Sequence, residues 1–154
     1  MSEEILDVCC GGKMFYFNKA DQRVHFCDKR ELDTYLCDGR HFVVKPDQLC
    51  DFTNLPFEDN SKSLIIFDPP HLVGESSGWQ KIKYGWLDTN WEEVISKGFK
   101  ECFRVLRKNG VLLFKWSEEN IKIKEVLSLA PDKPVCDMLG GRNGKTYCIV
   151  FFKT

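Results

Sequence analysis

The stretch Leu64–His71 reads LIIFDPPH, in which four apolar residues suited to a buried strand run into an acid, two prolines and an imidazole. Pro69 disfavours helical geometry at Asp68, and two successive prolines hold the backbone extended. Because neither proline has an N–H, the backbone groups that face outward here are carbonyl acceptors. A carboxylate beside carbonyls forms a rigid, acceptor-only edge that is complementary to an –NH2 group. His71 adds a flat side chain that can stack on a planar group.

Around this stretch, strand-like runs alternate with helical patterns along the chain. The runs that read as strands are Ile5–Cys9, Arg23–Asp28, Asp47–Phe52, Ser63–Asp68, Val111–Trp116 and the terminal pair Val135–Leu139 and Tyr147–Phe152. Apolar residues recur with a helical period in Trp91–Leu106, which the stretch Arg107–Gly110 is predicted to close, and Ile121–Leu129 reads as a second helix. Strands that alternate with helices predict an α/β fold with a mostly parallel sheet.

Two segments lack a clear period. Met14–Asp21 is expected to be a short helical or irregular piece. Lys29–Asp47, which contains RHFVVKP, favours an extra extended piece over a helix. This segment therefore reads as an insert between the second and third strands.

Acidic residues and glycines follow four of the predicted strands. Asp7 precedes a turn at Gly11–Gly12, Asp28 ends the second strand, Asp51 and Phe52 end the third, and Asp68 ends the fourth. Ligands of open parallel sheets collect at these carboxyl ends. A carboxylate there can accept from an amine or a hydroxyl, and glycine lets the backbone approach a ligand. Each position taken alone also fits a strand-exit turn, and the turn lacks the G-x-G-x-x-G spacing of a dinucleotide site.

Length and composition favour one compact domain, 1–154, of a protein that works in the cytoplasm. The chain has 154 residues, 43% apolar content and a net charge of −1, so any nucleic-acid binding requires a local basic patch. Its 8 cysteines form no C-x-x-C pair and no zinc spacing, which predicts free thiols and no metal. No signal-peptide pattern or run of transmembrane length occurs.

The order DVCCGG, Asp28, CDFTNLPF, FDPPH and ECFRVLRKNGVLLFKW resembles the class I S-adenosylmethionine-dependent methyltransferases. It is most similar to small phage- and prophage-type members related to DNA amino-methyltransferases with D/N-P-P-Y/F/W motifs. The resemblance implies a Rossmann-like, seven-stranded sheet of order 3-2-1-4-5-7-6 with an antiparallel C-terminal hairpin. Unlike those relatives, the chain shows no separate target-recognition domain, which leaves the substrate open. The chain departs from the pattern at His71, which replaces the usual aromatic, and in the insert Lys29–Asp47.

The resemblance also implies two sets of site residues. S-adenosylmethionine is the implied cofactor, with its ribose at Asp28 and its adenine near Asp51 and Phe52. The implied cofactor-binding residues are Asp7, Cys9, Gly11, Gly12, Asp28, Asp51 and Phe52. The implied catalytic residues, at the acceptor amine, are Asp68, Pro69, Pro70 and His71.

The loop after the fourth strand, residues 71–91, interleaves aromatic residues with cations. Its glycines and serines suggest mobility, and aromatics with cations beside an active edge could stack on a base and hold phosphate. A second basic site is possible in the terminal hairpin. The candidate substrate-binding residues are Trp79, Lys81, Lys83, Tyr84, Trp86, Arg142 and Lys145. A surface loop anchored by its aromatics, and a hairpin turn that is basic without a role, are the alternatives.

The expected activity is methyl transfer to an exocyclic amino group, with adenine N6 in DNA favoured. RNA or a protein glutamine amide offers the same –NH2 group, and the chain could instead be a catalytically inactive cofactor-binding subunit of a heteromeric complex. Nucleic acid is the expected partner, with no membrane and no metal. Whether His71 stacks on the acceptor or takes its proton stays open at this point.

Overall fold

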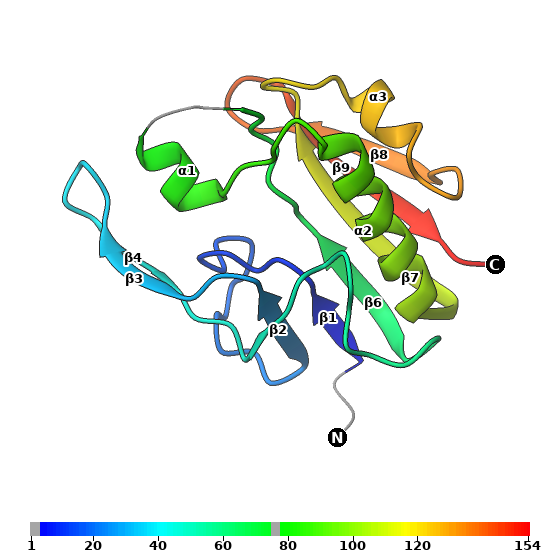
Figure 1. The fold of residues 1–154 in the computed structure, drawn as a ribbon. Helices are drawn as coiled ribbons and strands as arrows, with labels where there is room; N and C mark the ends of the chain where they lie inside the picture. Colours follow the sequence, from blue (N-terminus) through cyan, green and yellow to red (C-terminus); the bar gives the residue numbers. More distant parts are fainter. Residues whose placement is uncertain (1–3, 75–77) are drawn as a thin grey trace.

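The computed structural model describes residues 4–74 and 78–154, and a seven-stranded sheet forms its centre (Figure 1). In spatial order the strands are β5 (Gln48–Leu49), β2 (Val24–Asp28), β1 (Ile5–Asp7), β6 (Lys62–Phe67), β7 (Leu106–Ser117), β9 (Thr146–Phe152) and β8 (Cys136–Gly140). Neighbours pair in parallel from β5 to β7, whereas β9 runs antiparallel to both β7 and β8. The predicted mostly parallel α/β sheet with an antiparallel C-terminal hairpin is confirmed.

The strand labels do not follow the expected order 3-2-1-4-5-7-6, because of the insert. Strands β3 (Leu32–Tyr35) and β4 (His41–Val44) take two numbers but form a separate antiparallel hairpin. Numbered among the strands of the large sheet alone, the order reads 3-2-1-4-5-7-6. The extended piece expected within Lys29–Asp47 is this hairpin, which projects from the sheet near α1 (Trp79–Tyr84) in Figure 1.

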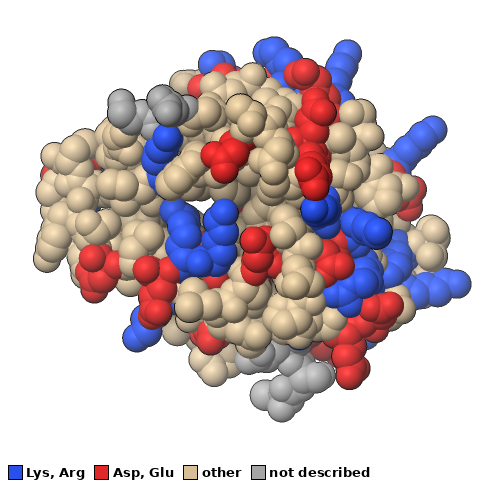
Figure 2. Space-filling model, viewed as in Figure 1, with Lys and Arg blue, Asp and Glu red and all other residues tan. Residues whose placement is uncertain are grey.

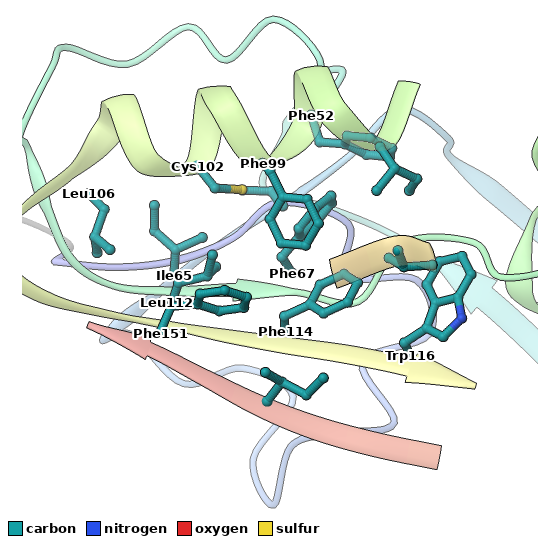
Figure 3. Close-up of a cluster of buried hydrophobic side chains, with 14 of the residues drawn as sticks. Phe52, Ile65, Phe67, Phe99, Cys102, Leu106, Leu112, Phe114, Trp116 and Phe151 are labelled. Atoms are coloured by element: carbon teal, nitrogen blue, oxygen red, sulfur yellow. The ribbon is translucent and has the colours of Figure 1, made fainter. Parts of the chain in front are cut away.

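Helix α2 (Trp91–Val105) covers one face of the sheet (Figure 1). Its first turn carries acidic residues, which interact favourably with the helix dipole. The residues that it buries recur at helical spacing, at Ile95, Gly98, Phe99, Cys102 and Val105. Figure 3 shows how Phe99 meets Phe67 of β6 and Phe114 of β7, with ring centroids 5.5 and 4.7 Å apart. This aromatic core fixes the strand ends on which the polar residues lie.

The end of α2 differs from the prediction. The helix stops at Val105, and Arg107–Gly110 belongs to β7 rather than closing the helix with a glycine cap. The reason lies in the segment that leads into β6. There, Asn60 and Ser61 donate their N–H groups to the last carbonyls of the helix, those of Arg104 and Val105. A glycine cap is unnecessary where a neighbouring segment satisfies these carbonyls.

Other elements are shorter than expected. The predicted third strand, Asp47–Phe52, forms only β5, because the Asp51 carboxylate binds the N–H and hydroxyl of Thr53 and turns the chain. The second helix is α3 (Ile123–Leu127), and Met14–Asp21 forms turns. None of the described helices is long and apolar enough to cross a membrane.

Candidate functional site

A cleft of about 690 Å³ opens at the carboxyl ends of β1, β2, β6 and β7. It brings together most of the predicted residues: Asp7, Cys9, Gly11, Gly12, Asp28, Phe52, Asp68, Pro69, Pro70, His71, Trp79, Lys83, Tyr84 and Trp86. Figure 2 shows a hollow between the part of the surface that holds α1 and the hairpin β3–β4 and the part that holds the sheet. The four strand ends therefore build one site.

Asp7 lies at the floor of the cleft and is almost fully buried. Its carboxylate accepts from the Cys9 N–H at 3.1 Å and from the Tyr16 hydroxyl at 2.8 Å. Burial raises the pKa of Asp7 to about 7; the hydrogen bonds from Tyr16 and Cys9 lower it, and the carboxylates of Asp68 and Asp28 raise it. Near neutral pH a small change of environment therefore changes the charge of this group.

Asp28 ties the glycine turn to the end of β2. Its Oδ2 accepts from the Gly11 N–H at 2.9 Å, and its Oδ1 accepts from the Arg30 N–H at 2.9 Å. The Arg30 side chain also approaches Oδ1, with Nε at 3.5 Å. Gly11 has φ +49°, and a Cβ there would meet nothing within 4 Å, so the turn leaves open space beside Asp28.

The insert hairpin packs directly on this turn. A Cβ on Gly12 would lie 2.7 Å from Cε2 of Phe42, a buried residue of β4. Only glycine permits this approach, so Phe42 holds the hairpin against the β1–β2 side of the cleft.

Asp68 lies at the other side of the cleft, where it is about one third exposed. Its Oδ2 accepts from the Lys115 ammonium of β7 at 2.9 Å. Burial lowers the pKa of Lys115, whereas the charge of Asp68 and its hydrogen bond raise it, and the net effect is a pKa above the ordinary value. The backbone carbonyls of Pro69 and Pro70 accept no hydrogen bond from another described residue. One carboxylate oxygen and the proline carbonyls thus remain as acceptors.

His71 lies among aromatic rings. Its ring centroid is 5.5 Å from that of Tyr84 and 6.4 Å from that of Trp116. Burial lowers the pKa of His71; of the neighbouring charges, Asp68 and Glu119 oppose this shift and Lys115 adds to it. The imidazole is therefore neutral at pH 7.

Helix α1 borders the cleft and is held to both of its sides. Arg30 donates to the carbonyl of Ile82 at 3.0 Å, while Gly85, which follows the helix, packs against Pro70, since a Cβ there would lie 3.1 Å from Cγ. The predicted cations lie over the predicted rings, Lys83 above Tyr84 at 5.0 Å and Lys81 above Trp86 at 5.0 Å. The serines expected to give this loop mobility, with Glu75, lie outside the described residues.

No protein-family model and no curated protein sequence match the chain. Solved structures do match it. A protein from Pyrococcus horikoshii has a TM-score of 0.63 at 16% identity, over 97% of this chain and 81% of that one. A SAM-dependent methyltransferase from Methanosarcina mazei has a TM-score of 0.59 at 13% identity, over 97% of this chain and 91% of that one. A geranyl diphosphate methyltransferase, solved with GPP and sinefungin, has a TM-score of 0.57 at 14% identity, over 97% of this chain and 71% of that one.

The chain has the Rossmann-like methyltransferase fold. At these identities the likeness concerns the fold, while the chemistry must be argued from the side chains of the cleft. The fold and the cleft agree in one respect, because ligands of such sheets bind outside the carboxyl ends of the strands.

Four predicted residues do not line the cleft of this methyltransferase fold. Asp51 is exposed, and its Oδ1 accepts hydrogen bonds from the N–H and the hydroxyl of Thr53. Lys81 is turned to Trp86, Arg142 lies exposed between β8 and β9, and Lys145 lies 3.8 Å from Glu119. Phe52 does line the cleft, but it is buried and packs on the core ring of Phe67 at 5.1 Å.

The residues that the sequence-based prediction missed include three whose side chains contact groups of the site: Lys115, Tyr16 and Arg30. The sequence could have indicated Lys115, because it is a single cation inside the apolar run VLLFKW. In the structure it faces the cleft from the central strand β7. No sequence pattern indicated Tyr16 or Arg30, because their contacts to Asp7 and to Ile82 depend on how irregular segments fold back.

Proposed function

We propose that the chain is an S-adenosylmethionine-dependent N-methyltransferase that acts on an exocyclic amino group, with adenine N6 in DNA as the favoured acceptor. One observation carries the proposal. The acceptor-only edge at Asp68–His71 opens onto the same cleft as the turn Cys9–Gly12 and Asp28. The edge that we propose binds the amine and the strand end that we propose binds the nucleoside thus line one cavity.

The residues on the β1–β2 side fit the proposed cofactor. A buried carboxylate at Asp28 suits the hydroxyl donors of a ribose, and the open glycine turn leaves room for the methionine part. Asp7 and the turn supply acceptors for a cationic amino group. Phe52 offers the edge of a core ring to an adenine, whereas Asp51 is engaged elsewhere. When bound, S-adenosylmethionine would supply a methyl group carried on a sulfonium sulfur, which would leave as a neutral thioether as an amino nitrogen takes the methyl.

Asp68 prepares that nitrogen. Lys115 holds Oδ2, so the second carboxylate oxygen and the proline carbonyls can accept the two N–H groups of an incoming amine. Fixed acceptors draw electron density onto a nitrogen whose lone pair is otherwise delocalised into its ring. The proline backbone holds these acceptors in place without a reorganisation step. After transfer the nitrogen releases one proton, which water can take.

The α1 side of the cleft suits a planar acceptor that carries phosphate. Trp79, Tyr84 and Trp86 present rings, and Lys83 lies above two of them, at 5.8 Å from Trp79 and 5.0 Å from Tyr84. Rings interleaved with cations are typical of surfaces that bind bases and their phosphates. This arrangement supports a nucleic-acid acceptor over a free amide.

The test is methyl transfer from tritiated S-adenosylmethionine to separate DNA, RNA and protein pools, with Asp68→Ala as the matched control. We expect label in DNA with the wild-type chain and background label with the variant. Label in RNA or in glutamine of protein would move the acceptor to that class. Cofactor binding without transfer to any pool would favour the inactive-subunit alternative, and absence of cofactor binding would reject the proposal.

A further inference from the structure

A second groove, of about 450 Å³, lies beside the cleft, between the glycine turn and the hairpin β3–β4. Five cations line it: Lys13, Lys19, Arg40, Lys45 and Lys83. None of the described residues that line this groove is acidic. The chain as a whole has a net charge of −1, so this groove is a local positive field on a chain whose charges nearly cancel overall.

The cations of the groove differ in how they are held. Arg40 pairs with Asp38, with Nη2 at 2.6 Å from Oδ2, and Lys13 lies over the Phe26 ring at 4.0 Å. Lys19 and Lys45 are exposed, and within the described chain neither has a carboxylate within ion-pair distance. These two ammonium groups are therefore available to an anion.

Exposed rings accompany the cations. At the hairpin, Tyr35 stacks on His41 with ring centroids 5.1 Å apart, and His41 lines the groove. Phe17, fully exposed, lies two residues before Lys19 on the loop that forms the opposite wall. Rings with free faces beside a line of cations are the usual elements of a site for single-stranded nucleic acid.

The groove continues into the cleft. Both are lined by Gly11, Gly12, Met14 and Lys83. The packing of Phe42 on Gly12 fixes the hairpin at this junction. A chain of phosphates that lies in the groove would therefore lead a base toward the edge at Asp68.

From these observations we infer that the groove between the hairpin β3–β4 and the loop Lys13–Lys19 binds the phosphodiester backbone of a single nucleic-acid strand. The inference rests on the proposed function and extends it, because it makes the insert the substrate-gripping part of the domain. A single strand fits, since its base is free to enter the cleft, whereas a base in a duplex must first be flipped out of its stack. DNA and RNA share the phosphodiester, and the experiment distinguishes them.

The experiment measures fluorescence anisotropy of labelled single-stranded DNA, single-stranded RNA and duplex DNA with the full chain over a salt series. Lys19→Ala/Lys45→Ala is compared with Lys108→Ala/Lys124→Ala, which removes two exposed lysines away from both cavities. For single strands the slope of log K against log salt falls by about 0.7 per lost phosphate contact, which predicts a slope smaller by about 1.4 and an affinity lower by about 25-fold at 0.1 M salt. The control pair is expected to bind like the wild type.

Thermal melting confirms that each variant is folded, and calorimetry on the same samples measures S-adenosylmethionine binding, which we expect to be unchanged. Equal losses in both pairs, an unchanged slope in the groove pair, or tighter binding of duplex would overturn the inference. So would an affinity for polyphosphate that equals that for the oligonucleotide. If wild-type chain binds cofactor but no nucleic acid, the inference fails while methyl transfer to another amine stands; if it binds no cofactor, the proposed function itself fails.

Discussion

The two sides of the cleft are built differently. On the β1–β2 side, Asp7 and Asp28 are each only 3% exposed, and both oxygens of each carboxylate accept hydrogen bonds from the chain itself. On the β6–β7 side, Asp68 is about one third exposed and is held by Lys115 alone among the described residues. The first two carboxylates are tied into the fold and keep only their remaining lone pairs for a ligand, whereas Asp68 keeps one oxygen without a protein partner among the described residues.

This difference separates what a substitution should change. Buried carboxylates that satisfy backbone N–H groups contribute to stability and shape the turn at which we propose that the cofactor binds, so their loss should affect folding and cofactor binding together. A carboxylate that is one third exposed and has one ionic partner contributes little to stability. Its loss should therefore appear in turnover.

The largest effect is expected at Asp68. Asp68→Ala removes the acceptor from the amine, and loss of one preorganised polar contact lowers kcat by about 100- to 1000-fold. Cofactor affinity and melting temperature should stay near wild-type values, because the contact is made with the acceptor. Steady-state kinetics and calorimetry measure the two quantities. Unchanged turnover would show that DPPH is only a strand exit.

A stability change is expected at Asp7, whose pKa rises from 3.8 to about 7 on folding. Between these values the folded chain binds the proton more tightly than the unfolded chain, so the free energy of unfolding falls as pH rises. For this group alone the fall between pH 5 and 8 is about 2–3 kcal/mol. Asp7→Asn removes the titration and should be more stable than wild type at pH 8. Denaturant unfolding across pH checks this, and parallel curves for both proteins would refute it.

Substitution of Asp28 is expected to lower the affinity for S-adenosylmethionine. Asp28→Ala removes the acceptor of the Gly11 and Arg30 N–H groups and the proposed ribose acceptor. Hydrogen bonds to a charged group contribute about 1.5–3 kcal/mol, so S-adenosylmethionine binding should weaken by about 10- to 100-fold. Asp28→Asn keeps one acceptor and serves as the milder control in the same calorimetric titration. A preference of the wild-type chain for NAD would contradict the assignment.

The smallest effect is expected at His71. Its neutral imidazole among Tyr84 and Trp116 suits stacking on a planar acceptor. His71→Phe should retain most activity, whereas His71→Ala should lose about tenfold, within the range of one base–aromatic stack. If the imidazole instead takes the proton, Phe will be as damaging as Ala. Rates of both variants across a pH series decide between these roles.

The sequence identified the strand ends but not what fills the space between them. Asp7, Asp28 and Asp68 were predictable because strand periodicity is local and parallel strands end at one edge. The hairpin β3–β4 was predicted only as an extended piece, although its turn contains Asp38-Gly39, a common hairpin signal, and Gly39 has φ +80°. Tertiary donors from Asn60 and Ser61 ended α2 where a local rule expected a glycine cap. Similarly, Lys115 of β7 reaches Asp68 at the end of the neighbouring strand β6, a contact that spacing along the chain does not encode.

The most direct measurement of the central claim is the identity of the methylated atom. Single-stranded DNA is incubated with the chain and S-adenosylmethionine, digested to nucleosides and analysed by mass spectrometry against methylated standards, with Asp68→Ala in parallel. An amino group held at the Asp68 edge predicts methyl on an exocyclic nitrogen, adenine N6 first, and no such product from the variant. Methyl on a ring carbon, a ring nitrogen or an oxygen, or equal product from Asp68→Ala, would contradict the account.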